Sequence, residues 1–407
     1  MPFEQNTNMK PTVILVGNPE IIKLGLIRSL GEDGFNIINV YLSNHKWRDL
    51  FRRKPIDYFS RYVSAFYLVN RKDLIDFLIK KISKRGHKSV ILTVDDSTTF
   101  LLDKSYNQLK EYFLLANINQ QEEGIIHSMD KYSQKLQAQK IGLNVAKGWV
   151  IPFIGGEYQI PQDLEYPCFI KGRYSYHNSK RIQQKCNDEL ELRSLLDTCQ
   201  QLYPYDLIAE EYIPVDKEFG IIGACWDGQC VFPAIVEFLV MGNGSSNGVS
   251  MFGSVDSLDK NQQLSHQIHL FLLGLHYTGI CNMDFIESQG KLFFVELNFR
   301  FASYGYAVNK AGINIPILYV NTLLKLDVAK LINIQVKKKY FYFNEKIGIR
   351  NVQEKYISQE QYNLLDKRAD FCMVKSTQDL KPYIFFILTE PIVHIKMLLQ
   401  TILSKFR

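Results

Sequence analysis

The first hundred residues alternate between short apolar runs and amphipathic stretches, and this alternation restricts the folds that the chain can adopt. Residues 12–17 (TVILVG), 35–43 (FNIINVYLS) and 89–96 (SVILTVDD) have the pattern of buried strands. Residues 19–34 and 71–86 have the spacing of amphipathic helices, and the first of these begins at a proline and ends at a glycine. Strands that alternate with helices predict a doubly wound parallel sheet, which binds ligands at the carboxyl ends of its strands.

In the middle third, runs of strand patterns replace the regular alternation of strands and helices, which is typical of an α+β domain in two lobes. A capped helix is expected from near Ser128 to Gly142. Strands are expected at 145–151, 166–172, 181–185, 207–213, 218–228, 229–240 and, as a hairpin, 279–300, with helices at 187–202 and 262–275.

The expected fold class is therefore α/β and α+β. We expect an N-terminal α/β domain over residues 1–122, followed by a domain over 123–330 with lobes at about 123–205 and 206–330. A small α+β extension is expected over 331–407.

Composition excludes several classes of protein. The 407 residues are 46% hydrophobic and 22% charged, as in ordinary folded proteins. The net charge of +6 suits an anionic substrate, but the chain carries no recognisable nucleic-acid-binding motif. The seven cysteines show neither a CxxC pair nor zinc-ligand spacing, so a reducing cytoplasm is expected. No stretch resembles a signal peptide or reaches the roughly 18 apolar residues of a membrane span.

An apolar strand near residue 300 carries an unexpected set of polar residues. Side chains two positions apart in a strand share a face, so Glu296, Asn298 and Arg300 are expected on one face of residues 295–300 (VELNFR). If the preceding hairpin loop holds an odd number of residues, Asp284 joins the same face. Two carboxylates and an amide beside an arginine suit magnesium better than zinc, although a solvated strand face gives the same pattern.

Two lysines stand where a positive charge needs an anion. Lys171 ends an apolar strand, and Lys131 opens a helix at the end that the helix dipole already makes positive. Each alone is also typical of a surface lysine. The polar loop at 172–181 holds Lys180 and has the length of a mobile flap over phosphates.

Two strand ends carry carboxylates with more than one interpretation. Glu210–Ile213 end a strand before Pro214, and Glu218 opens the next, so this hinge could face an adenine and a ribose or be an ordinary acidic hairpin. Asp95 and Asp96 end another strand, where they suit either a ligand or a helix cap.

The order of these features resembles the ATP-grasp superfamily over roughly residues 12–330. The matching features are Asp130 and Lys131 opening a helix, an apolar strand ending in Lys171, the EEYI run at 210–213 with a glutamate seven residues beyond Glu211, and Asp284 followed by ExNxR. Residues 303–320 resemble the closing segment of the superfamily. One departure is Phe299, which stands where the family usually has a proline and removes a rigid backbone angle but no ligand.

The resemblance implies a role for each matching residue. Lys131, Lys171 and Lys180 would bind ATP phosphates, and Glu210, Glu211, Tyr212, Ile213 and Glu218 would hold adenine and ribose. Asp284, Glu296 and Asn298 would bind Mg²⁺, with two ions expected and Mn²⁺ as a substitute, and Arg300 would contact the transferring phosphate together with Lys171.

Within the superfamily, the chain is most similar to D-aspartate ligase and related carboxylate–amine ligases. This resemblance implies that ATP phosphorylates a carboxylate, such as that of aspartate, and that an amine of another amino acid or of a cell-envelope precursor displaces the phosphate. The alternatives are a kinase of the same superfamily that phosphorylates a hydroxyl, or a nucleotide-binding partner protein without turnover.

Partners beyond small molecules are expected to be few. The amphipathic, basic segment at 392–407 either packs on its own domain or touches an anionic membrane surface weakly. No nucleic acid is expected, and a homodimer is implied only by the habit of the family.

Overall fold

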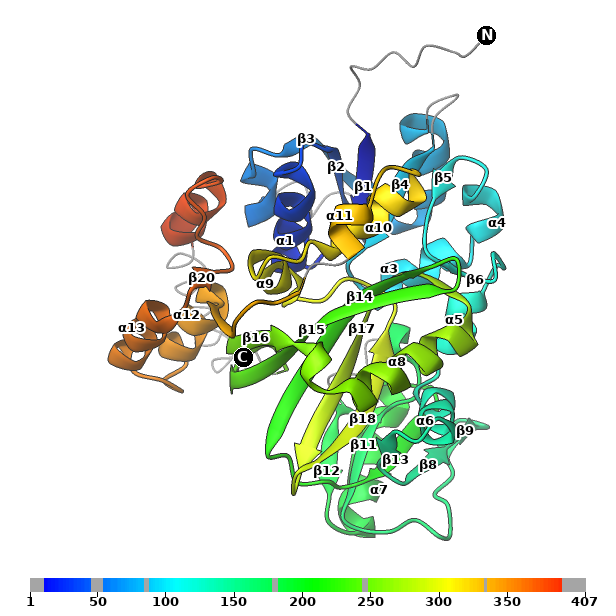
Figure 1. The fold of residues 1–407 in the computed structure, drawn as a ribbon. Coiled ribbons are helices and arrows are strands. Elements are labelled where there is room, and N and C mark those ends of the chain that lie inside the picture. The colour runs from blue at the N-terminus through cyan, green and yellow to red at the C-terminus, as the bar shows by residue number, and fades with distance from the viewer. Residues whose placement is uncertain are drawn as a thin grey trace, which may run out of the picture.

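The computed structural model describes residues 11–44, 54–83, 88–177, 182–243, 248–332 and 335–389. Its N-terminal part is a parallel sheet with the strand order β3-β2-β1-β4-β5, drawn in blue and cyan in Figure 1. The strands are β1 (Thr12–Val16), β2 (Asn36–Ser43), β3 (Val63–Asn70), β4 (Ser89–Thr93) and β5 (Phe113–Leu114). All of their pairings are parallel, which confirms the sheet predicted from the alternation of strands and helices.

The helices around this sheet agree with the sequence in part. Helix α1 (Glu20–Gly31) follows β1, as predicted. The predicted helix at 71–86 is instead a short 3₁₀ turn, the helix α2 (Leu74–Phe77) and a π turn that ends at Ile82. Helix α3 (Asp96–Asp103) follows β4 and is capped by Asp95, whose side chain accepts a hydrogen bond from Thr98 N. Helix α4 (Tyr106–Leu109) then leads to β5.

A small antiparallel sheet forms the lower lobe in Figure 1, with the order β12-β11-β13-β8. Its strands are β8 (Gly148–Ile151), β11 (Cys168–Gly172), β12 (Gln184–Cys186) and β13 (Leu207–Glu211). Helix α7 (Glu189–Leu202) buries Leu192, Leu195 and Leu196 against them. Helix α6 (Lys131–Lys140) is capped by Asp130, so the predicted start near Ser128 was wrong. Ser128 instead ends the separate helix α5 (Gly124–Ser128), where its hydroxyl donates to Gly124 O.

A long, largely antiparallel sheet forms the centre of the molecule, in the order β20-β19-β16-β15-β14-β17-β18-β7. Its strands are β7 (Asn144–Val145), β14 (Lys217–Trp226), β15 (Gln229–Met241), β16 (Ser250–Ser257), β17 (Tyr277–Ser288), β18 (Lys291–Asn298), β19 (Tyr340–Phe343) and β20 (Phe371–Cys372). The short strand β6 (Asn117–Ile118) pairs with β17, and helix α8 (Gln262–Leu275) packs against the sheet. The expected C-terminal extension therefore contributes two strands to the central sheet.

The hairpin of β17 and β18 places Asp284 and Glu296 on one face, as predicted, but its turn differs from the one that the prediction required. Its turn holds two residues, Gln289 and Gly290, both with positive φ, and not the odd number that the prediction required. A bulge at Val295 shifts the register by one, so Asp284 still lies directly opposite Glu296. Without this bulge, Glu296 would point to the other face of the sheet.

One hydrophobic core joins the N-terminal sheet to the central sheet. Helices α9 (Gly305–Lys310) and α10 (Ile315–Leu323) bury Tyr306 and Leu318 in it, next to Ile27 of α1 and Ile222 of β14. The carboxyl end of β4 is thereby held against the end of β18.

The C-terminal part packs beside α1, where Figure 1 draws it in orange and red. Helices α12 (Glu345–Gln353) and α13 (Gln359–Arg368) precede β20. Arg28 of α1 is fully buried, and its Nε lies 3.1 Å from Asp379 Oδ2. The same guanidinium donates to the carbonyl oxygens of Met373 and Val374, so the last described segment is fixed to the first helix.

Two further features concern the cysteines and the length of the apolar helices. A disulfide joins Cys225 and Cys230, which are paired across the β14–β15 hairpin. In the part of the chain that the structure describes, no helix combines the length and the apolar character needed to cross a membrane. The segment at 392–407, expected to pack on its own domain or touch a membrane, lies outside the described residues.

Candidate active site

Three of the predicted metal ligands meet on one face of the β17–β18 hairpin. Asn298 donates from its Nδ2 to Asp284 Oδ2 at 3.1 Å and to Glu296 Oε1 at 3.4 Å. Burial, and to a lesser extent the neighbouring Glu296, raises the pKa of Asp284 to about 7. A hard divalent cation such as Mg²⁺ fits a set of two carboxylates and one amide. The described residues hold no group of three or more His, Cys, Asp and Glu side chains suited to a metal, so the amide and other oxygens would have to complete the site.

Lys131 is bound to this face by an ion pair. Its Nζ lies 2.8 Å from Glu296 Oε2, and the lysine side chain is only 5% exposed. Burial acts to raise the pKa of Glu296, but Lys131 and Lys171 outweigh it and lower that pKa to about 2. Burial acts in turn to lower the pKa of Lys131, and Glu296 raises it above its usual value. Both groups are therefore charged at neutral pH.

A second cationic cluster lies where α6 faces the small sheet. Lys171 Nζ of β11 and Lys135 Nζ of α6 lie 2.8 and 2.6 Å from the same oxygen of Glu210, on β13. All three side chains are nearly buried. Two ammonium groups share one carboxylate, so the cluster has a surplus positive charge that suits a phosphate.

The sequence analysis missed Lys135. It follows Lys131 by four residues, so both lysines lie on one face of α6. Two like charges at this spacing destabilise a helix unless anions lie nearby, and this was the available signal.

The start of the expected phosphate flap is held by ion pairs. Arg173 contacts both oxygens of Asp130, at 3.0 and 2.7 Å, and its Nη1 lies 3.0 Å from Asp206 Oδ2. Farther along, Tyr176 stacks on Phe100 of α3, with ring centroids 4.4 Å apart. The flap therefore contacts the helix that follows β4. Lys180 lies outside the described residues, and its phosphate role stays a prediction.

Arg300 lies two residues beyond the end of β18 and contacts the N-terminal part of the chain. Its Nε is 3.0 Å from Asp96 Oδ1, and both side chains are about one-fifth exposed. Burial acts to lower the pKa of Arg300, but Asp96 and Asp284 raise it above its usual value. The backbone is fixed here because Asn282, directly opposite Asn298, donates to Arg300 O at 2.9 Å.

The residues expected to hold adenine and ribose lie at or just beyond the end of β13 and near the start of β14. Glu210 faces the lysines, and Glu211 is exposed, with its N–H donating to Lys147 O. Tyr212 N donates to Pro167 O, whereas within the described residues the N–H of Ile213 has no acceptor. Glu218 shares the face of Asp284, because Gly220, two residues on, pairs with Asp284. Burial raises the pKa of Glu218.

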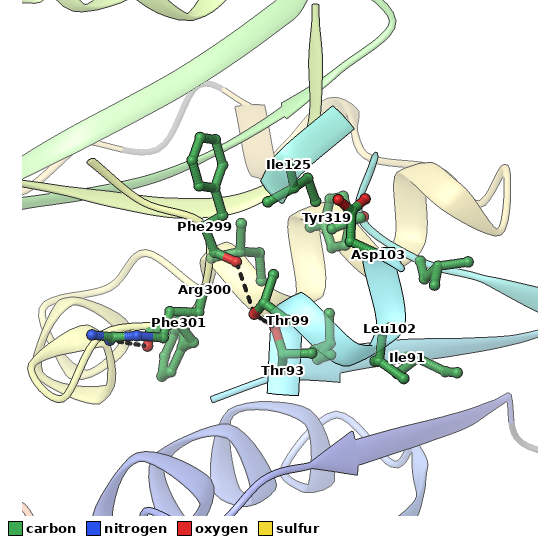
Figure 2. Close-up of a pocket in the computed structure, with 14 residues that line it drawn as sticks. Ile91, Thr93, Thr99, Leu102, Asp103, Ile125, Phe299, Arg300, Phe301 and Tyr319 are labelled. Atoms are coloured by element: carbon green, nitrogen blue, oxygen red, sulfur yellow. Dashed lines mark hydrogen bonds between the residues drawn. The ribbon is translucent and has the colours of Figure 1, made fainter. Parts of the chain in front are cut away.

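A small cavity lies behind this site, between α3 and the end of β18 (Figure 2). It measures about 20 Å³, which is room for about one water molecule and too little for a nucleotide. Asp103 and Tyr319 line it, and each has a buried oxygen without a hydrogen-bond partner. In Figure 2 the guanidinium of Arg300 points away from the cavity, and most of the lining side chains are apolar, so the cavity belongs to the hydrophobic core.

Known proteins resemble the chain more clearly in structure than in sequence. No family model matches it. An N5-carboxyaminoimidazole ribonucleotide synthase of Vibrio vulnificus is 29% identical over 102 residues, which is 25% of this chain and 26% of that protein. The match thus spans about a quarter of the curated relative.

Solved structures match most of the chain. An L-amino acid ligase from Bacillus licheniformis has a TM-score of 0.60 at 14% identity and covers 82% of this chain and 80% of its own. An N5-carboxyaminoimidazole synthetase from Staphylococcus aureus has a TM-score of 0.59 at 15% identity and covers 86% of each chain. Together with the sheets described above, this likeness shows that the chain has the ATP-grasp fold.

Proposed function

We propose that the protein is an ATP- and Mg²⁺-dependent ligase that joins a carboxylate to an amine through an acyl phosphate. One observation carries the proposal: the buried Lys131 pairs with Glu296, and Lys171 and Arg300 act on the same carboxylate, beside a face of two carboxylates and an amide. Cations placed in this way stabilise the charge that develops when a phosphoryl group is transferred. The likeness to structures of an L-amino acid ligase and an N5-carboxyaminoimidazole synthetase supports the proposal.

The overall reaction would be RCOO⁻ + ATP⁴⁻ + R′NH₃⁺ → RCONHR′ + ADP³⁻ + HPO₄²⁻ + H⁺. In the first step a carboxylate oxygen forms a bond to the γ-phosphorus of ATP, and the bond to the β-phosphate oxygen breaks. In the second step the amine nitrogen forms a bond to the acyl carbon, and phosphate leaves with the electron pair of the broken C–O bond.

The cationic residues and the end of β13 would bind ATP. Lys131 and Lys171, joined by Lys135, would hold the phosphates of ATP, with Lys180 as a further contact on the flap. Glu210, Glu211, Tyr212 and Ile213 would border the adenine, and Glu218 would accept hydrogen bonds from the ribose hydroxyls.

The metal face would act beside these residues. Asp284, Glu296 and Asn298 would hold Mg²⁺, as two ions or with Mn²⁺ in its place, and the metal would neutralise the charge on the phosphates. Arg300 and Lys171 would orient the transferring group.

The finer parts of the proposal concern substrates and setting. An amino acid such as aspartate is the proposed donor, and another amino acid or a cell-envelope precursor is the proposed acceptor. The structural likeness to the L-amino acid ligase of Bacillus licheniformis supports an amino acid substrate. A cytoplasmic location, a homodimer and the division of the chain near residues 122 and 330 belong to the same proposal.

The test is ADP and hydroxamate formation by the purified protein with Mg-ATP, hydroxylamine and a panel of D- and L-amino acids and small carboxylates. Hydroxylamine intercepts an acyl phosphate, so we expect a hydroxamate with at least one donor. ATP binding without any hydroxamate, together with a stable phosphorylated product from a hydroxyl compound, would replace the ligase with a kinase.

A further inference from the structure

The ion pair between Arg300 and Asp96 leaves one carboxylate oxygen unused beside the proposed reaction centre. Arg300 Nε contacts Asp96 Oδ1, and among the described residues Asp96 Oδ2 accepts no hydrogen bond. The side chain is 19% exposed, so a solute can reach it. The neighbouring Asp95 differs, because its oxygens accept hydrogen bonds from Asn18 N, Ser97 Oγ and Thr98 N.

Asp96 lies within electrostatic range of the whole site. It helps to raise the pKa values of Lys131, Asp284 and Arg300, which belong to three different elements. A carboxylate in this place has three possible uses: as a metal ligand, as a support for Arg300, or as a contact for a cationic substrate. Asp96 does not gather with Asp284 and Glu296 into a three-carboxylate metal group in the described part of the chain, so the first use is not supported.

If Asp96 only supported Arg300, its second oxygen, Oδ2, would have no role. Only Nε of the guanidinium is held by Asp96, and its terminal nitrogens remain able to face an anion, since Nη1 makes just a long contact of 3.4 Å to Phe301 O. The anion would be the acyl phosphate of the proposed function, on which this argument rests. The free oxygen of Asp96 then lies beside the group that the amine must attack.

We propose that Asp96 is the binding residue for the acceptor, which carries a protonated amine. The ammonium group would donate to Oδ2, next to the acyl phosphate that Arg300 holds. Its nitrogen would lose one proton, by way of Asp96, to solvent and then attack the acyl carbon. The second proton would leave with phosphate, according to RCO–OPO₃²⁻ + R′NH₃⁺ → RCO–NHR′ + HPO₄²⁻ + H⁺.

The wall around this position is formed by α3 and the described start of the flap. Phe100 follows Asp96 by four residues, so both lie on one face of α3, and Phe100 stacks on Tyr176 of the flap. The acceptor position is therefore bounded by α3, the flap and Arg300, three parts of the chain that come together only in the folded protein.

The experiment uses methylammonium as the cationic probe and hydroxylamine, which is largely neutral at pH 8, as the nucleophile. We expect methylammonium chloride to inhibit hydroxamate formation by the full chain in competition with hydroxylamine, relative to equal potassium chloride. In Asp96→Asn the inhibition constant should rise about tenfold or more, and Asp96→Glu should restore part of the difference. The exposed Asp76→Asn is the matched control and should leave the constant unchanged.

The inhibition constant separates the possible roles, because it reports how methylammonium competes with hydroxylamine within one variant and not how fast that variant turns over. If Asp96 only positions Arg300, Asp96→Asn slows hydroxamate formation but keeps the same inhibition constant, and the inference is overturned. No inhibition of the wild type by methylammonium would overturn it as well. Absence of any hydroxamate from the wild type would instead show that the ligase proposal has failed, and this inference with it.

Discussion

Lys135 and Lys171 come from different elements and contact the same oxygen of Glu210, at 2.6 and 2.8 Å. Burial lowers the pKa of Lys135 to about 8, although Glu210 partly offsets this. The cluster therefore remains mostly cationic at neutral pH and can bind an additional anion. We propose that this anion is a phosphate of ATP.

Lys135→Ala should weaken ATP binding although the sequence pattern did not select this residue. The change removes one of the two ammonium groups that share Glu210 beside the proposed phosphate position, so KM for ATP should rise on the order of tenfold. Lys140→Ala, an exposed lysine of the same helix, is the control and should leave KM unchanged. Steady-state ADP formation measures both, and equal KM values for the two variants would remove Lys135 from the ATP site.

Glu296→Gln should abolish most turnover while the fold survives. The change keeps the size of the side chain but removes a proposed metal ligand and the partner of Lys131, so kcat should fall on the order of 10²–10³-fold. Glu287→Gln lies on the same hairpin, at its ion pair with Lys217, and is the matched control. Circular dichroism checks the fold, and a folded Glu296→Gln enzyme of normal activity would refute the metal assignment.

The raised pKa of Asp284 predicts a pH-dependent response to magnesium. The folded protein holds this proton more tightly than the unfolded chain does, so without metal the group destabilises the fold as pH rises from about 4 to about 7. At pH 8 Mg²⁺ should restore about 1 kcal/mol, which is roughly 1 °C in Tm for a chain of this length.

A variant that cannot ionise tests this cause. Asp284→Asn should lack both the pH dependence and the gain from Mg²⁺, because an amide neither binds a proton in this range nor neutralises a cation. Thermal unfolding at pH 5 and pH 8, with and without Mg²⁺, measures the difference. A wild-type gain from Mg²⁺ that is equal at both pH values would contradict the role of Asp284.

Phe100→Ala should uncouple ATP hydrolysis from amide formation. The stack of Phe100 on Tyr176 holds the flap against α3, and its loss should admit water to the acyl phosphate. We expect the ratio of ADP to amide product to rise severalfold over the wild-type ratio. Tyr112→Ala, which removes an exposed ring of the same N-terminal part, should keep the wild-type ratio. An unchanged ratio in Phe100→Ala would show that this stack does not exclude water.

Arg28→Met should destabilise the protein strongly. The change leaves Asp379 as a buried carboxylate with only Ser60 Oγ and Arg61 N as donors, a situation that costs about 3–5 kcal/mol. The control Lys310→Met breaks a partly exposed ion pair with Glu32 and should cost less than about 1 kcal/mol. Urea unfolding measures both, and similar losses would show that the burial of Arg28 has little energetic effect.

The sequence predicted individual strands and helices better than the pairing of strands that are distant in the sequence. Apolar runs and helix caps are local, so the parallel sheet, α7, α8 and the β17–β18 hairpin could all be predicted. Strand β3 was missed because it lies at the edge of its sheet with a mostly half-exposed pattern. A small α+β extension was expected after residue 330, but strands β19 and β20 were neither located in it nor assigned to the central sheet, because pairing between distant segments leaves no local signal.

The candidate site shows the same division. Asp284, Glu296 and Asn298 were predicted to share a face, and they do, but through a bulge at Val295 that depends on the partner strand. Asp96 was left between ligand and cap, and the structure separates the two: Asp95 caps α3, and Asp96 contacts Arg300. Asp96 and Arg300 are 204 positions apart in the sequence, and only folding brings Asp96 Oδ1 to 3.0 Å from Arg300 Nε.

The contact between Arg28 and Asp379 also has a consequence for protein synthesis. Asp379 follows Arg28 by 351 positions. The ribosome therefore makes α1 long before it makes the carboxylate that pairs with Arg28. Until the segment around Asp379 has been made, the guanidinium of Arg28 must stay in water, although the folded protein buries it completely. Helix α1 therefore reaches its final packing only after the segment around residue 379 has been made, and a nascent chain halted before residue 379 should remain open to proteases around α1.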